Sequence, residues 1–100
     1  MVYSPERDDP GLKINSSKIP KVVTGFSSLC KKKGKFLYSK IYKKIVITSN
    51  IKTAEMTKLY ENIFRAVNIS LVNETKMILK KFKIDINEVI QTASTKPFGF

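Results

Sequence analysis

Two groups of polar side chains in the sequence have types and spacings that could carry out chemistry. In the first, Glu6 follows Pro5 and precedes Arg7, so that a carboxylate held by an ion pair could accept a proton or a hydrogen bond. In the second, Lys58 and Asn62 stand at i and i+4 in a segment of helical periodicity and therefore point the same way. An ammonium beside a carboxamide can donate hydrogen bonds to a sugar hydroxyl or to a developing oxyanion. Both groups would also be ordinary on a charged, solvated surface.

Two neighbouring features bear on this interpretation. Glu61 is turned about 100° away from the Asn62 side of the helix, so it serves as an internal comparison for that face. Cys30 falls in the first turn of a predicted helix after Ser28, where the helix dipole and the following lysines should lower its pKa. Nothing in the sequence places a base or an oxyanion site beside this thiol. We therefore interpret Cys30 as a buried or bystander cysteine.

The composition is that of one globular domain, with 100 residues of which 42% are apolar. One cysteine and no histidine exclude an internal disulfide, a histidine-containing zinc site and a Ser-His dyad. No apolar run approaches the ~20 residues of a membrane span, and the first residues do not have the pattern of a signal peptide. We therefore expect a cytoplasmic location and no membrane partner.

The net charge of +11 is concentrated in one stretch, since eleven lysines and no acid lie between Lys13 and Lys52. Such a field attracts anions, including nucleic acid, phosphate groups and anionic lipid. The lysines are interspersed with aliphatic residues and few aromatic ones, which favours a solvated lysine-rich surface over one that stacks bases. No nucleic acid partner is therefore expected. The alternative that stays open is a stand-alone basic helical module that binds another protein or nucleic acid.

The elements that would position these residues begin with a loop over 3–11, which contains two prolines and three acids. A short buried strand is predicted over 19–25, a helix over about 27–42 and a second strand over 44–49. A strand-helix-strand segment of this size is typical of the β-α-β unit of a parallel sheet. The apolar residues expected on the inner face of the helix are Leu29, Phe36, Leu37 and Ile41.

Apolar residues at spacings of three and four, with no glycine or proline, predict one long helix over 53–82. About 30 helical residues would be ~45 Å long, whereas a compact chain of this length has a radius of gyration of ~13 Å. A further helix is predicted from the capping pattern at 85–88 to about Ser94. The apolar face of the long helix exceeds what the chain can cover, so we expect a piece of a larger protein that pairs with a second copy. That face includes Ile63, Val67, Leu71 and Ile78.

Four blocks in this order and spacing resemble one family. They are YSPERDDPG (3–11), IPKVVTG (19–25), TAEMTKLYENIFRAVNISLVNE (53–74) and STKPFGF (94–100). Together they resemble the UDP-glucose/GDP-mannose dehydrogenase family of NAD-dependent nucleotide-sugar 6-dehydrogenases, and the similarity covers essentially the whole chain. Within the family they are most similar to the enzymes for UDP-N-acetylhexosamines, in particular those for UDP-N-acetyl-D-glucosamine.

This resemblance implies an α/β fragment. Residues 1–50 would be the C-terminal part of the NAD-binding Rossmann-like domain, with its last β-α-β part and the substrate loop at 3–11. Residues 51–100 would be the long helix and the start of an all-α central domain through which the enzyme forms a homodimer. The implied reaction oxidises the sugar C6 alcohol to a carboxylate, with NAD as hydride acceptor, for precursors of surface polysaccharides.

The resemblance also assigns roles to the polar groups. Glu6 would take part in the acid-base steps at the substrate, with Arg7 beside it. Lys58 and Asn62 would hold the C6 oxygen of the sugar and stabilise the oxyanion. The chain lacks the dinucleotide-binding motif G-x-G-x-x-G, and the cysteine nucleophile of the family is expected beyond the KPFGF block. Cys30 matches no catalytic position, so we expect the isolated chain to be inactive.

Overall fold

The computed structural model of the chain describes residues 1–7 and 15–100. These residues divide into two compact units, Met1–Asn62 and Ile63–Phe100. The predicted substrate loop is described only in part, because its residues 8–11 lie outside the described ranges. None of the described helices is long and apolar enough to cross a lipid bilayer.

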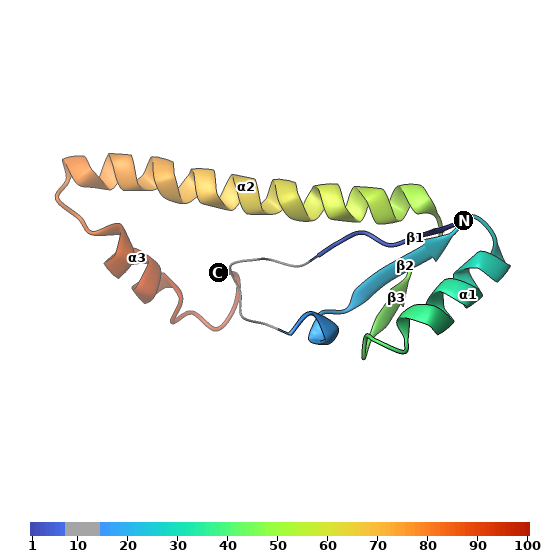
Figure 1. Cartoon of the computed structure of the whole chain (residues 1–100). Coiled ribbons are helices and arrows are strands. Elements are labelled where there is room, and N and C mark those ends of the chain that lie inside the picture. Colours follow the sequence, from blue (N-terminus) through green and yellow to red (C-terminus); the bar gives the residue numbers. More distant parts are fainter. Residues whose placement is uncertain (8–14) are drawn as a thin grey trace. The chain divides into compact units, whose positions relative to one another are not determined.

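The first unit is built on a three-stranded sheet with the order β1-β2-β3 (Figure 1). The strands are β1 (Val2–Tyr3), β2 (Lys21–Gly25) and β3 (Ile45–Ile47). β2 and β3 run parallel, which confirms the predicted strand-helix-strand unit. β1 pairs antiparallel with β2, with Val2 opposite Gly25 and Tyr3 opposite Thr24. The prediction of a loop at Tyr3 is wrong, because that residue pairs with a strand far along the chain and no local pattern encodes the pairing.

β2 is buried along its whole length, as predicted for a short buried strand. A 3₁₀ turn, η1 (Ser16–Lys18), precedes it. β2 begins two residues later than predicted and immediately follows Pro20, which has no N–H to donate to the sheet. The buried side chains of Val22, Val23 and Thr24 form the centre of this unit.

The helix α1 (Ser28–Tyr38) joins the two parallel strands and ends four residues before the predicted end at 42. Ser27 caps its start, because its side chain accepts a hydrogen bond from the amide of Cys30. At the other end the amide of Lys40 donates to the carbonyl of Leu37, at the tighter i to i+3 spacing that often ends an α-helix. The helix thereby stops early enough for the chain to return to β3.

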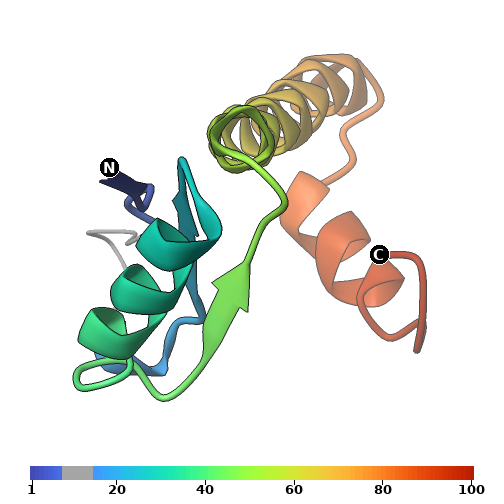
Figure 2. The ribbon, with the colours of Figure 1, turned by 90° about the vertical axis from the view of Figure 1, so that its right-hand side faces the viewer.

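The helix α1 lies along the sheet (Figure 2). It contacts the strands at Gly34. A Cβ atom at Gly34 would lie 2.8 Å from a methyl carbon of Val2 and 3.0 Å from one of Val23. The predicted inner face of this helix is wrong, since its four residues are 60 to 66% exposed: Leu29, Phe36, Leu37 and Ile41. The helix approaches the sheet through its smallest side chain, which the apolar pattern does not show.

The helix α2 (Ile51–Lys81) is uninterrupted, which confirms the long helix predicted over 53–82. It begins two residues earlier than predicted because Asn50 caps it, with the side-chain oxygen accepting a hydrogen bond of 2.8 Å from the amide of Thr53. Ala54, close to this cap, is fully buried. The start of α2 is thus anchored in the first unit.

The second unit contains the remainder of α2 and the helix α3 (Ile86–Ala93). Asp85 caps α3 by accepting a hydrogen bond of 2.9 Å from the amide of Asn87, which confirms the start predicted from the capping pattern. The described residues therefore form a three-stranded sheet and three α-helices, in agreement with the expected α/β class. The assignment of the first unit to a Rossmann-like domain stays a prediction.

Candidate functional site

The SPER segment, residues 4–7, runs beside β2 and is tied to it by side chains. The Ser4 hydroxyl donates to the carbonyl of Val22 at 2.6 Å, and Lys21 Nζ donates to Glu6 Oε2 at 3.2 Å. Arg7 Nη1 donates to the carbonyl of Pro20 at 2.8 Å. Ser4, Glu6 and Arg7 thus each make a side-chain contact with β2 or with the residue immediately before it.

The pairing follows the register of the sheet. Because Val2 lies opposite Gly25 in the antiparallel pair, the same register places residue 6 opposite 21 and residue 7 opposite 20. Pro5, which is buried, cannot donate to a backbone ladder, and past it the pairing is made by side chains. The register with β2 thus brings the Glu6 carboxylate beside Lys21.

Among the described residues, Lys21 forms an ion pair with Glu6, which sequence reasoning missed. The side chain of Lys21 is 7% exposed and that of Glu6 is 67% exposed. The buried ammonium also lies 5.8 Å from the ring centre of Tyr38 and 5.2 Å from that of Tyr42. Adjacency in sequence indicated Arg7 instead, but it is the backbone amide of Arg7 that donates to Glu6, at 2.9 Å. A lysine at the first position of a buried strand was the signal that could have found this pair.

The guanidinium of Arg7 instead binds Glu61 on α2. Arg7 Nη2 lies 2.6 Å from Glu61 Oε1, and Nε lies 3.3 Å from Oε2, so both carboxylate oxygens are engaged. The two side chains are 26% and 31% exposed. Glu61 is therefore not the uninvolved neighbour that helical geometry alone indicated, because it ties the SPER segment to the long helix.

Lys58 and Asn62 lie on the same stretch of α2 as Glu61. Lys58 is half-buried and Asn62 is exposed, and neither side chain makes a hydrogen bond or ion pair with another residue of the described ranges. Their donors are therefore available to a bound molecule. Lys58 is also three residues from Glu61 and so adjacent to it on the helix surface. The structure thus brings the segment that carries Glu6 and the stretch that carries these donors together through one ion pair.

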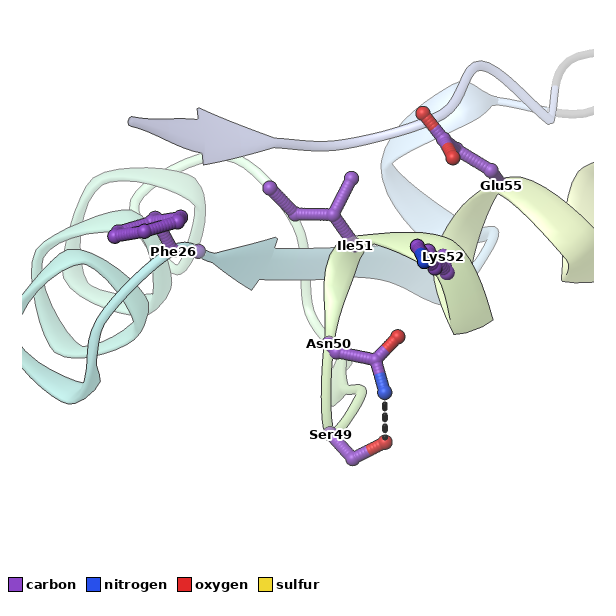
Figure 3. Close-up of a pocket in the computed structure, with 7 residues that line it drawn as sticks. Phe26, Ser49, Asn50, Ile51, Lys52 and Glu55 are labelled. Carbon is purple, nitrogen blue, oxygen red and sulfur yellow. Dashed lines mark hydrogen bonds between the residues drawn. The ribbon is translucent and has the colours of Figure 1, made fainter.

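A pocket of about 490 Å³ lies where β2 and β3 end and α2 begins (Figure 3). The residues that line it are Gly25, Phe26, Ser49, Asn50, Ile51, Lys52 and Glu55. In Figure 3 the Asn50 carboxamide donates to the Ser49 hydroxyl, at 3.2 Å. None of the predicted site residues lines this pocket. The carboxyl ends of parallel strands are the usual ligand edge of α/β sheets, and the two predicted strands were the signal for it.

The structure gives Cys30 a lowered pKa, as predicted, but for a different reason. A hydrogen bond from the Ser27 hydroxyl, at 3.2 Å, is the main cause, and one from the N-terminal ammonium, at 3.3 Å, adds to it. Together they lower the pKa of the Cys30 thiol to about 7. The lysines that follow in the sequence are not among the causes. Within residues 1–7 and 15–100 no cluster of His, Cys, Asp and Glu side chains could hold a metal ion.

Comparison with known proteins agrees with the family indicated by the four blocks. The profile of the UDP-glucose/GDP-mannose dehydrogenase family, central domain, matches residues 52–100. The chain is 42% identical over 100 residues to Protein CapL of Staphylococcus aureus, covering 94% of this chain and 23% of that protein. It is 35% identical over 98 residues to the UDP-N-acetyl-D-mannosamine dehydrogenase of Salmonella typhi, covering 97% of this chain and 23% of that protein.

A solved structure shows the same fold. The native structure of the UDP-N-acetyl-mannosamine dehydrogenase Cap5O from Staphylococcus aureus matches with a TM-score of 0.82 at 34% identity, over 99% of this chain and 24% of that one. In sequence and in fold, the chain matches a segment of proteins named as nucleotide-sugar dehydrogenases. The chain belongs to the UDP-glucose/GDP-mannose dehydrogenase family.

The chain spans 23% of the length of each of these two curated relatives. This agrees with the expectation that it corresponds to a piece of a longer enzyme. The names of the Salmonella protein and of Cap5O specify N-acetylmannosamine, whereas the sequence resemblance was strongest to the N-acetylglucosamine enzymes.

Proposed function

We propose that residues 1–100 supply the substrate loop and the long central helix of a cytoplasmic, NAD-dependent UDP-N-acetylhexosamine 6-dehydrogenase. The complete enzyme would oxidise the sugar C6 alcohol to a carboxylate, for precursors of surface polysaccharides. The observation that carries this proposal is the 34% identity and TM-score of 0.82 to a solved enzyme over 99% of the chain. The names of the relatives favour the manno over the gluco configuration of the sugar.

Three residues would carry the chemistry. Glu6, held at the sheet edge by Lys21 yet largely exposed, would exchange protons at the substrate. Lys58 and Asn62 would donate hydrogen bonds to the C6 oxygen and stabilise negative charge as it develops there. Two observations support this role: their side-chain donors are unused among the described residues, and the two residues have i, i+4 spacing.

Arg7 would lie beside the substrate as a fourth residue. Within the described part of the chain, three of the five N–H groups of its guanidinium donate to Glu61 and Pro20, which leaves two for a bound molecule. Its place next to Glu6 supports the assignment.

NAD, when bound to the complete enzyme, would accept the hydride. The residues of this chain do not fit its diphosphate, because the sequence has no G-x-G-x-x-G and β2 ends on a single glycine, Gly25, before the bulky Phe26. We therefore assign no cofactor contact to any residue of this chain.

The chain alone is expected to be inactive, because the thiol and the dinucleotide loop of the family are not in its sequence. The measurement mixes the purified chain with NAD and UDP-N-acetylmannosamine or UDP-N-acetylglucosamine and follows NADH absorbance. Sustained turnover by the chain alone would contradict the proposal that the complete enzyme supplies the cofactor site and the thiol from other segments.

A chimeric enzyme tests whether residues 1–100 can support the proposed activity. Residues 1–100 replace the matching 24% of Cap5O from Staphylococcus aureus. We expect NADH formation that depends on the UDP-sugar, and the preferred sugar reports the configuration. Glu6→Gln in the chimera should abolish most of the activity. A folded chimera that binds both ligands and forms no NADH would refute the proposed function.

A further inference from the structure

We propose that Glu61 is a positioning residue that acts through Arg7 and holds the SPER segment, which carries Glu6, at a fixed place on α2. This inference rests on the proposed function. It gives a role to a residue that helical geometry indicated only as an uninvolved neighbour of Asn62. Glu61 is not proposed to touch the substrate.

The first support is the geometry of the pair. Two guanidinium nitrogens of Arg7 meet the two carboxylate oxygens of Glu61, at 2.6 and 3.3 Å. A planar guanidinium that meets a carboxylate at both oxygens fixes orientation as well as distance, which a lysine ammonium cannot do. The pair is about 70% buried on both sides, so water competes with it less than with a fully exposed pair.

The second support is what else Arg7 holds. Its third donor, Nη1, binds the carbonyl of Pro20 immediately before β2. One side chain therefore joins the loop, the entry to the central strand and the long helix. The pair with Glu61 lies about three turns beyond the cap at Asn50, so the part of α2 that belongs to the first unit is held at a second point.

The third support is the position of the pair between the proposed chemical groups. Glu6 precedes Arg7 in the chain, and Asn62 follows Glu61. A shift of the loop along α2 would therefore move the carboxylate relative to the helix donors. Misplacement by about 1 Å in an active site can cost on the order of 100-fold in rate. The ion pair prevents such a shift.

The experiment is a double-mutant cycle in the chimera, with Glu61→Gln, Arg7→Lys and the double variant. We expect Glu61→Gln to lower kcat by roughly 10- to 100-fold while KM for the UDP-sugar changes little. In the Arg7→Lys background the same substitution should have almost no further effect, because Glu61 acts through the guanidinium. Glu74→Gln is the matched control, since it removes the same charge from an exposed position of α2.

The outcomes separate this inference from the proposed function. Unchanged kcat in a folded Glu61→Gln enzyme, or an equal loss in the parent and Arg7→Lys backgrounds, overturns the positioning role. An inactive chimera speaks against the proposed function, and the pair is then judged from chemical denaturation of the 100-residue chain and its three variants. If Glu61→Gln shifts the unfolding midpoint equally in the parent and Arg7→Lys backgrounds, the Arg7–Glu61 interaction is refuted. If the shift disappears in the Arg7→Lys background, the interaction is supported.

Discussion

At the scale of single residues, Lys58, Asn62 and Glu61 lie close together on α2 but differ in the contacts of their side chains. Lys58 and Asn62 keep their side-chain donors unused within the described chain, whereas Glu61, between them in sequence, is fully engaged by Arg7. A surface helix normally satisfies its long polar side chains with water, so unused donors alone do not define a site. We assign them a role because the Arg7–Glu61 ion pair joins the segment that carries Glu6 to the same stretch of α2.

Asn62→Ala in the chimera should lower kcat by roughly 10²–10³-fold, the usual cost of removing one preorganised donor to an oxyanion. KM for the UDP-sugar should change little, because the missing hydrogen bond would be strongest in the transition state. Steady-state NADH formation at varied UDP-sugar concentration measures both.

Asn73→Ala is the control for that variant. It makes the same change on the same helix about three turns further along, and Asn73 is exposed. Equal losses of kcat from the two substitutions, in folded proteins, would show that the Asn62 face of α2 has no special part in the chemistry.

At the scale of elements, glycines decide how closely α1 meets the sheet. A Cβ atom at Gly25, the last residue of β2, would lie 2.7 Å from the Cβ of Cys30 and 2.8 Å from the backbone nitrogen of Lys31. At Gly34 the nearest atoms are instead methyl groups of Val2 and Val23. A backbone cannot move aside as a side chain can, so the two glycines are not equally replaceable.

Gly25→Ala is therefore expected to destabilise the chain by about 1–3 kcal/mol or more, through overpacking against the first turn of α1. Gly34→Ala should cost less, because the side chain of Val2 is partly exposed and can shift, and because alanine favours helix by about 0.5–1 kcal/mol over glycine. Midpoints of chemical denaturation of the two variants and the parent chain test the order. A Gly34 variant less stable than the Gly25 variant would contradict it.

At the scale of the whole molecule, the described chain leaves many large apolar side chains in contact with water. On α2 the residues predicted to pair with a second copy are exposed to between 46 and 61%: Ile63, Val67, Leu71 and Ile78. An apolar stripe of this length on a surface helix is typical of an interface. We propose that it forms the homodimer contact of the enzyme.

Sedimentation velocity of the chain at micromolar concentration should show a dimer. Val67→Lys should shift it toward monomer, because the charge would be buried in the middle of the stripe. Val72→Lys makes the same change on the same helix, turned about 140° from Val67, and should leave the dimer intact. A monomeric parent chain, or equal dissociation by both variants, would refute this interface.

The sequence alone determined whatever is encoded by neighbours along the chain. The cap of α3 at Asp85 joins residues two apart, and the uninterrupted α2 follows from a periodic apolar pattern without glycine or proline. The parallel pair β2–β3 follows from the length of a strand-helix-strand segment. The family followed from four blocks in a fixed order, because motifs along a chain need no knowledge of contacts.

Only the tertiary structure decided which side chains meet across the chain. Lys21 pairs with Glu6, 15 residues away in sequence, and Arg7 pairs with Glu61, 54 residues away. Neither pairing is marked by a periodic or local pattern in the sequence. The register of β1 on β2 sets the first pair, and the placement of α2 beside the loop sets the second. The proposed site depends on both, because a charged side chain takes the oppositely charged partner that folding brings within reach, whatever its distance in sequence.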